Sequence, residues 1–250
     1  MNLGLDGLVF VVTGGSRGLG LAGAQALVGE GARVVVCARD EQKVRAAVTA
    51  LGEDRALGVA GDLSDAALPQ RLVDAARQRF GRLDGALVSV GGPVRGGALE
   101  VSDEQWRDAF ESVFLGAVRV CRAVVPALPA GGGALALVLS TTVRAPMPGL
   151  ATSNALRPGL AMLAKTMADE LGPQGVRVNG LLPGSVETDR LRELDRGDAA
   201  VRGEREATIP LRRYGTPAEF GRVAAFLLSP AASYLTGAMV PVDGGATRAL

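Results

Sequence analysis

The chain has 250 residues, a length that fits one α/β domain with a full hydrophobic core. Hydrophobic residues make up 48% of it, charged residues make up 21%, and the formal net charge is +1, which are ordinary values for a globular protein. This charge provides no electrostatic basis for binding nucleic acid or an anionic membrane, so we expect neither partner.

The cysteine content and the start of the chain indicate the compartment. Two cysteines, Cys37 and Cys121, cannot build a disulfide framework. The first residues lack a basic region followed by an apolar stretch, and no apolar run reaches membrane-spanning length. We therefore expect a cytoplasmic protein without a signal peptide or a transmembrane helix.

Short apolar runs alternate with longer amphipathic segments along the whole chain. The runs predict strands at Leu8–Thr13, Arg33–Ala38, Ala56–Ala60, Gly85–Val90, Gly133–Ser140, Arg177–Leu182 and Ala238–Val242. The segments between them predict helices at 18–30, 40–51, 65–80, 103–128, 154–172 and 217–229. Strands that are apolar on both faces are typical of a sheet covered on both sides. The alternation predicts a single domain over 1–250 with a doubly wound, seven-stranded parallel sheet.

A glycine-rich turn follows the first predicted strand. Gly14, Gly18 and Gly20 have the spacing G-x-x-x-G-x-G and lead directly into a helix. Glycines let the backbone approach a ligand closely, and a helix N-terminus offers unpaired N–H groups to a pyrophosphate. The turn therefore predicts a nucleotide cofactor on a Rossmann-type fold.

The polar, charged segment 185–212 interrupts the regular alternation. It follows the end of a strand, where open α/β sheets bind ligands, so a substrate lid is one interpretation. A solvated surface loop is the other.

Several motifs in a fixed order resemble those of the short-chain dehydrogenases/reductases over the whole chain. They are Thr13-Gly14 with Gly18-x-Gly20, Gly61-Asp62-Leu63, the run 87–92, Ser140 after a strand, Val178-Asn179-Gly180, Pro183-Gly184-x-Val186-x-Thr188, Gly215-Thr216-Pro217-x-Glu219 and Val242-Asp243-Gly244-Gly245. The resemblance implies an oxidoreductase with a nicotinamide cofactor and a small-molecule substrate. The cofactor-binding residues that it implies are Gly14, Ser16, Arg17, Gly18, Leu19, Gly20, Arg39, Asp62, Leu63, Val90, Gly91, Pro183, Gly184, Val186 and Thr188.

Within that set, the resemblance places Asp62 and Leu63 at the adenine, and Pro183, Val186 and Thr188 at the nicotinamide. Two of these residues also have ordinary structural interpretations. Asp62 is a candidate helix N-cap, in competition with Ser64, and Thr188 is a candidate loop hydroxyl.

The end of the second strand favours NADPH over NADH. NAD binders place a carboxylate there, but the matching residue is Ala38, followed by Arg39, with Arg17 in the glycine turn. Two guanidinium groups suit a 2′-phosphate through forked, charge-assisted hydrogen bonds. Asp40 is the counter-argument, because a shift of one or two residues would make it the NAD carboxylate.

The resemblance fails at the catalytic residues. The family uses a serine, a tyrosine as general acid, a lysine four residues later, and often an asparagine on the preceding helix. Ser140 matches the serine, but Ser153 stands where the tyrosine is expected, Arg157 replaces the lysine and Val113 replaces the asparagine. Tyr214 and Tyr234, the only tyrosines, lie in segments that the family uses for structure. The chain also lacks histidine, and its carboxylates and cysteines form no metal-ligand pattern, so we expect no metal site.

Pro158 bears on where the helix at 154–172 begins. A proline is harmless in the first turn but removes a hydrogen bond further inside a helix. We therefore predict a start near Asn154, with Thr152 or Ser153 as the cap. Ser153 and Asn154 are accordingly capping candidates as well as catalytic ones.

Two functions from different classes remain. The first is reduction of an activated C=C (enone) or a ketone of a small specialised metabolite, with Ser140, Thr141 or Asn154 donating a hydrogen bond to the developing oxyanion and Arg157 binding the ribose. The second is cofactor binding without redox turnover, as a sensor, a scaffold, or an isomerase or cyclase. The family resemblance also implies a homotetramer or homodimer formed through segments 103–128 and 154–172.

Overall fold

The computed structural model describes residues 2–189, 191–192 and 198–248. Seven parallel strands form one sheet in the order β3-β2-β1-β4-β5-β6-β7. Their bounds are Val9–Thr13, Arg33–Ala38, Ala56–Ala60, Gly85–Ser89, Ala134–Val138, Arg177–Pro183 and Met239–Val242 for β1 to β7. The predicted doubly wound α/β fold is confirmed, with each strand within two residues of its predicted bounds.

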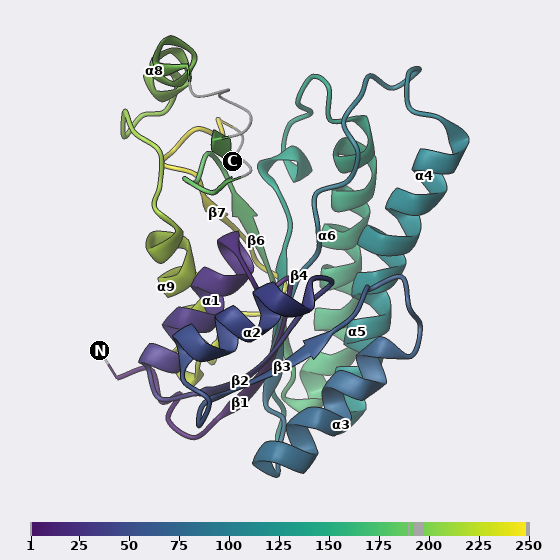
Figure 1. The fold of residues 1–250 in the computed structure, drawn as a ribbon, viewed down its shortest axis with the longest axis vertical. Helices are drawn as coiled ribbons and strands as arrows, with labels where there is room; N and C mark the ends of the chain where they lie inside the picture. Colours follow the sequence, from purple (N-terminus) through teal and green to yellow (C-terminus); the bar gives the residue numbers. More distant parts are fainter. Residues whose placement is uncertain (1, 190, 193–197, 249–250) are drawn as a thin grey trace.

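Helices cover both faces of this sheet (Figure 1). One face carries α1 (Gly18–Gly29), α2 (Glu41–Leu51) and α9 (Pro217–Leu228). The other face carries α3 (Leu68–Phe80), α5 (Gly116–Val124) and α6 (Ala151–Leu171).

The side chains of β1 show how the sheet divides the core. Val9 and Val11 point into the cluster under α3, α5 and α6. Phe10 and Val12 point into the cluster under α1, α2 and α9. Every residue of β1 is buried, as expected for a central strand covered on both faces.

The order of the strands indicates where a sheet of this kind binds its ligand. β1 lies between β2 and β4, so the direction of chain progression reverses between β1 and β4. In open parallel sheets, ligands bind at the carboxyl ends of the strands beside such a reversal. The glycine-rich turn follows β1 directly, so it lies at this position.

The segment predicted as one helix over 103–128 is divided in the structure. It contains α4 (Asp103–Ala109), a π-helical stretch η1 (Phe110–Leu115), α5 and a short 3-10 turn η2 (Val125–Ala127). At the end of the π-helical stretch the chain passes close to the loop after β3, because a Cβ on Gly116 would lie 2.9 Å from the Cβ of Leu63. Such π-helical turns are frequent at functional sites.

The predicted start of the helix near Asn154 was wrong. α6 begins at Ala151, its N-cap is Leu150 without a side-chain hydrogen bond, and Pro158 lies inside the helix. The hydroxyls of Thr152 and Ser153 do not cap it, because both make tertiary hydrogen bonds, to the Val94 carbonyl and to Thr142 respectively. These contacts replace the local capping bonds that the sequence suggested.

The predicted lid over 185–212 is partly helical. Of this segment, residues 190 and 193–197 lie outside the described residues. The rest includes α8 (Ala199–Thr208), capped by Asp198, above the ends of β6 and β7 (Figure 1). The remaining short 3-10 turns are η3 (Thr141–Val143), η4 (Gly172–Gln174) and η5 (Pro230–Ala232).

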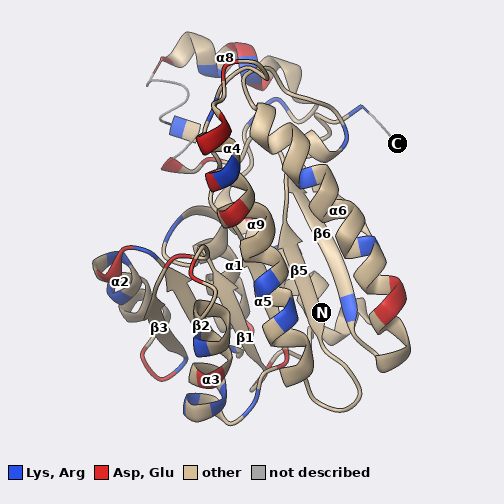
Figure 2. Ribbon diagram, turned by 90° about the vertical axis from the view of Figure 1, so that its right-hand side faces the viewer, with Lys and Arg blue, Asp and Glu red and all other residues tan. Residues whose placement is uncertain are grey.

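Charged side chains do not gather by sign on the face that Figure 2 shows. Basic and acidic residues are interspersed along α3, α4 and α8 in that view. Among the helices that the structure describes, none combines the length and the apolar character needed to cross a bilayer.

Candidate functional site

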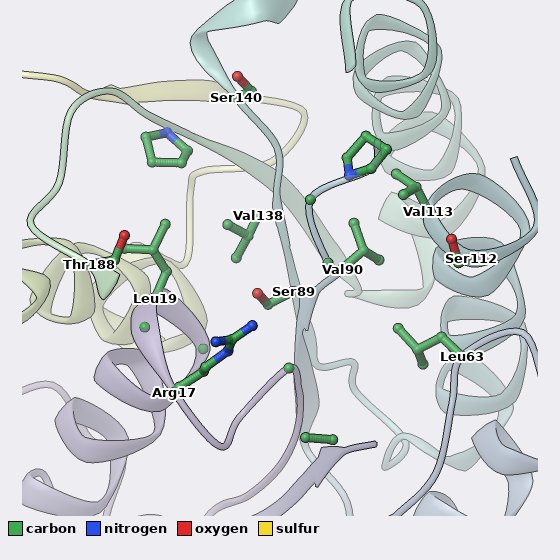
Figure 3. Close-up of a pocket in the computed structure, with 18 of the residues that line it drawn as sticks. Arg17, Leu19, Leu63, Ser89, Val90, Ser112, Val113, Val138, Ser140 and Thr188 are labelled. Atoms are coloured by element: carbon green, nitrogen blue, oxygen red, sulfur yellow. The ribbon is translucent and has the colours of Figure 1, made fainter. Parts of the chain in front are cut away.

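A cavity of about 500 Å³ opens at the carboxyl ends of β1 to β6. Figure 3 shows Thr188 and Leu19 on one side of it, Ser112 and Val113 on the other, and Ser140 near the end of β5. Of the predicted site residues, Thr141 and Asn154 are missing from its walls. The others are Gly14, Ser16, Arg17, Gly18, Leu19, Gly20, Arg39, Asp62, Leu63, Val90, Gly91, Ser140, Ser153, Arg157, Pro183, Gly184, Val186 and Thr188.

The glycine-rich turn has the geometry of an anion-binding turn. Gly14 has φ +59° and Gly18 has φ +55°, which L side chains rarely adopt. A Cβ on Gly14 would also lie 2.8 Å from the carbonyl oxygen of Ser89. α1 begins at Gly18, and Arg17 at its N-cap provides no side-chain cap. The first N–H groups of α1 therefore face the cavity uncapped, which fits the pyrophosphate of a dinucleotide.

A pair of buried hydrogen bonds, which sequence analysis did not identify, fixes the floor of the cavity. The Thr13 hydroxyl donates to the Ser89 carbonyl and accepts from the Ser89 N–H, both at 2.9 Å. Thr13 is fully buried at the end of β1, and Ser89 is the last residue of β4. These bonds hold β1 and β4 together, the two strands between which the direction of chain progression reverses.

The end of the cavity where the sequence predicts the adenine carries Arg17, Arg39 and Asp62. Nε of Arg39 lies 3.8 Å from Oδ2 of Asp62, and both side chains are exposed. Asp62 also accepts hydrogen bonds from the backbone N–H and the hydroxyl of Ser64. Neither residue caps α3, because that helix begins at Leu68 with Ala67 at its N-cap.

Asp40 is engaged elsewhere. Its carboxylate caps α2 by accepting from the backbone N–H of Lys43, and it forms an ion pair with the Lys43 ammonium at 3.2 Å. These hydrogen bonds lower the pKa of Asp40. The carboxylate is absent from the cavity walls among the described residues, so it does not occupy the position of a ribose-binding carboxylate.

The loop after β6 forms the opposite wall. The N–H of Glu187 donates to the Gly215 carbonyl at 2.8 Å, and the N–H of Gly215 donates to the Ser185 carbonyl at 3.0 Å. This bridge holds Val186 against the cavity with only 5% of its surface exposed. Thr188 follows it and lies 3.7 Å from the position of a Cβ on Gly18, so the loop closes over the glycine-rich turn.

Ser140 and Ser153 are both hydrogen-bonded to Thr142. Ser140 has an extended backbone two residues after the end of β5, and its Oγ accepts from the Thr142 N–H at 3.1 Å. The Oγ of Ser153, on α6, lies 3.2 Å from Oγ1 of Thr142. Both serines line the cavity.

Arg157 is a buried cation one turn further along α6. Only 7% of its surface is exposed, and its Nη1 donates to the carbonyls of Val138 at 2.8 Å and Leu139 at 2.7 Å. These bonds attach α6 to the end of β5, and they fix the guanidinium in the cavity wall beside Ser140. The spacing from Ser140 predicts Arg157 in the site, but no pattern in the sequence indicates these two carbonyl partners.

Asn154 has a different position from the one expected of a substrate-binding group. Its Oδ1 accepts from the backbone N–H of Met147 at 3.1 Å, and its Nδ2 donates to the Met147 carbonyl at 2.9 Å. The amide lines a separate hollow between 96–98 and 146–149. It therefore fastens the loop before α6.

Neither tyrosine belongs to the described cavity walls. Tyr214 is buried, and the guanidinium of Arg202 lies 5.0 Å from the centre of its ring. Tyr234 is fully exposed near the C-terminus. Cys37 does line the cavity, but burial raises the pKa of its thiol to about 12, so it remains protonated. Within the described parts of the chain, no three potential metal ligands cluster.

Proteins of similar sequence are oxidoreductases and dehydrogenases. A family model described as enoyl-(acyl carrier protein) reductase matches residues 14–247. An uncharacterized oxidoreductase of Mycobacterium tuberculosis is 36% identical over 248 residues, covering 97% of this chain and 93% of the relative. Trans-4-hydroxycyclohexanecarboxylate dehydrogenase of Sinomonas cyclohexanicum is 34% identical, covering 96% and 92%.

Solved structures agree over the whole length of the chain. L-sorbose reductase from Gluconobacter frateurii, in complex with NADPH and L-sorbose, has a TM-score of 0.93 at 31% identity, covering all of both chains. A short chain oxidoreductase from Pseudomonas aeruginosa, described as containing an atypical catalytic center, has a TM-score of 0.92 at 33% identity, covering 99% and 100%. The chain therefore belongs to the short-chain dehydrogenase/reductase family and is an NAD(P)-dependent oxidoreductase.

Proposed function

We propose that the protein is an NADPH-dependent reductase that acts without the family's Tyr-x-x-x-Lys pair, in a divergent subset of the family. Its substrate is an activated C=C (enone) or ketone of a small specialised metabolite. One observation carries the proposal: Ser140, Ser153 and Arg157 line the same cavity as the cofactor-binding turn, whereas both tyrosines lie elsewhere.

The preference for NADPH rests on the adenine end. Arg17 and Arg39 line the cavity there, and Asp40 is engaged as the cap of α2. Guanidinium groups bind phosphate through paired, charge-assisted hydrogen bonds. The relatives from Gluconobacter frateurii and Pseudomonas aeruginosa have structures with NADPH bound, which supports the same cofactor here.

The reaction divides between cofactor and protein. Held by the glycine-rich turn and the loop after β6, NADPH would supply a hydride to the β-carbon of the enone, and negative charge would then develop on the carbonyl oxygen. Ser140 donates a hydrogen bond to that oxygen and stabilises the enolate. The enolate then takes its proton from water, so no tyrosine is required.

Conjugate reduction fits these residues better than simple ketone reduction. An alkoxide needs a proton from a positioned acid, and a serine hydroxyl is a poor acid. Arg157 cannot replace it, because a guanidinium does not give up its proton in proteins. The match to an enoyl reductase model agrees with a C=C substrate. A ketone remains a substrate where a separate hydroxyl group on the same substrate molecule supplies the proton.

We assign a lid role to the segment 185–212, as far as it is described. Leu191 and Asp189 line the cavity beside Thr188. Arg202 on α8 pairs with Glu187 at 3.0 Å, next to the loop that bounds the cofactor site. The helix is thereby attached to the cavity wall by a side chain at the rim.

The test is turnover on a panel of cyclic enones and matched saturated ketones, followed by loss of NADPH absorbance. We expect consumption with at least one enone, and a decrease in kcat of about 100-fold in Ser140→Ala with unchanged NADPH binding. Ser233→Ala, an exposed serine outside the cavity, is the matched control. NADPH binding without consumption on any substrate would instead favour a sensor, a scaffold, or an isomerase or cyclase.

A further inference from the structure

Thr142 makes hydrogen bonds to both serines of the site, although it does not line the cavity itself. It lies in the 3-10 turn η3 with 3% of its surface exposed. Its backbone N–H donates to Ser140 Oγ, and its hydroxyl bonds Ser153 Oγ. One buried residue behind the cavity wall therefore contacts the hydroxyl groups of two serines that line the cavity.

The bond from the backbone N–H uses an acceptor position of Ser140 and leaves its proton available for donation. A serine hydroxyl has one O–H to donate and two lone pairs to accept. The N–H of Thr142 occupies one lone pair of Ser140 Oγ, so the oxygen accepts from behind. Its single O–H is then left to donate into the cavity that Ser140 lines, where a substrate oxygen would accept it.

The hydroxyl of Thr142 contacts the hydroxyl of Ser153 in a similar way. A serine inside a helix commonly bonds back to the carbonyl four residues earlier. Ser153 instead faces Thr142 at 3.2 Å, with 6% of its surface exposed. When Thr142 is the donor, the O–H of Ser153 is left to point into the cavity that Ser153 lines.

We propose that Thr142 is a positioning residue that orients the O–H groups of Ser140 and Ser153 toward one substrate oxygen. Two serine donors then take the places of the family's serine and tyrosine, with Ser153 at the tyrosine position. The inference rests on the proposed reductase function. It goes beyond that function by assigning Ser153 as a second oxyanion donor and Thr142 as the residue that aligns both.

The decisive variant is Thr142→Val, which keeps the shape and the backbone N–H but removes the hydroxyl. We expect kcat for the enone to fall about 10-fold with little change in KM, because alignment of one oxyanion donor is lost. Thr142→Ser retains the hydroxyl and restores the rate. Thr166→Val on α6, whose hydroxyl bonds only the local Met162 carbonyl among the contacts described, controls for the chemical change.

A binding measurement separates orientation from turnover. 4-Nitrophenol, titrated by absorbance on the protein with NADP⁺ bound, places a phenolate oxygen where the enolate oxygen would form. We expect Thr142→Val and Ser153→Ala each to raise the pKa of the bound phenol by about one unit, the equivalent of a 10-fold loss of stabilisation. The double variant should lose no more than either single variant, because both remove the same donor.

The outcomes distinguish the two claims. Full activity and an unchanged phenol pKa in Thr142→Val would overturn the role of Thr142 while leaving the reductase intact. Additive losses in the double variant would also overturn it. A wild-type protein that neither reduces an enone nor binds the phenol would overturn the proposed function, and this inference with it. If Thr142→Val fails to fold, Thr142→Ala removes the same hydroxyl and is judged by the same two readouts.

Discussion

Arg39 and Asp40 are adjacent in sequence but have different surroundings. Arg39 lines the cavity and is paired loosely with Asp62 at 3.8 Å, whereas Asp40 is committed to the N-terminus of α2. A weak, exposed ion pair costs little to exchange for a phosphate. We infer that Arg39 leaves Asp62 for the 2′-phosphate when NADPH binds.

This predicts a selective effect of Arg39→Ala. The dissociation constant for NADPH should rise about 10- to 100-fold, the usual strength of a hydrogen bond to a charged group, with little change for NADH. Fluorescence titration of both nucleotides measures the ratio. Arg45→Ala, on the exposed side of α2 where it pairs with Glu41, should alter neither constant. Equal weakening of the two nucleotides would exclude the 2′-phosphate assignment.

At the residue level, the order of motifs along the chain predicted the residues of the glycine-rich turn better than the contacts around Ser140 and Ser153. Glycines such as Gly14 are constrained by the backbone itself, so the motif predicted their place in the cavity. The partners of Thr142 and Arg157 come from segments distant along the chain, so no local pattern indicates them. Asn154 had a matching position in the sequence, but its bonds to Met147 direct it away from the cavity.

Among the elements, the strands were the most predictable. β1, β4 and β5 are buried along their whole length, and continuous apolar runs revealed them. The π-helical turn η1 and the early start of α6 depend on tertiary contacts, so helical periodicity could not reveal them. α8 has no buried residue, which left no apolar stripe to detect.

The N-terminus of α9 carries a pH-dependent contact. Hydrogen bonds from Arg213, and then from the backbone N–H of Thr216, hold the pKa of Glu219 at about 2, below its usual 4.5. Because folding favours the carboxylate, its contribution to stability is present above pH 4.5 and is lost as the pH falls toward 2.

We therefore expect Glu219→Gln to lower the urea midpoint of unfolding at pH 7. The difference from wild type should shrink as the pH falls from 4.5 toward 2, where the wild-type carboxyl also loses its charge. Glu104→Gln, a change at an exposed glutamate of α4, is the control. A difference that stays constant over this pH range would show that the charge of Glu219 does not contribute.

For the whole molecule, we propose a homodimer or homotetramer formed through the segments 103–128 and 154–172, which include η1 and most of α6. Phe110 is 43% exposed and stacks on Phe114, and Met162 on α6 is 69% exposed. Exposed large apolar side chains on long helices are candidates for burial in a subunit interface.

Sedimentation velocity tests this assembly. We expect the wild-type protein to sediment as a dimer or tetramer, and Met162→Glu to shift it to a smaller species, because a buried unpaired carboxylate is unfavourable. Leu99→Glu changes a fully exposed apolar residue outside these helices and should leave the assembly intact. A monomeric wild-type protein would refute the proposal.

The measurement that tests the central claim most directly is a parallel titration of the purified protein with NADPH and NADH. The glycine-rich turn, the uncapped start of α1 and the two arginines predict saturable binding of NADPH, with weaker binding of NADH. Such binding would establish that the cofactor site is intact although the tyrosine and lysine are replaced. Failure to bind either nucleotide would contradict the account and remove the basis for a reductase.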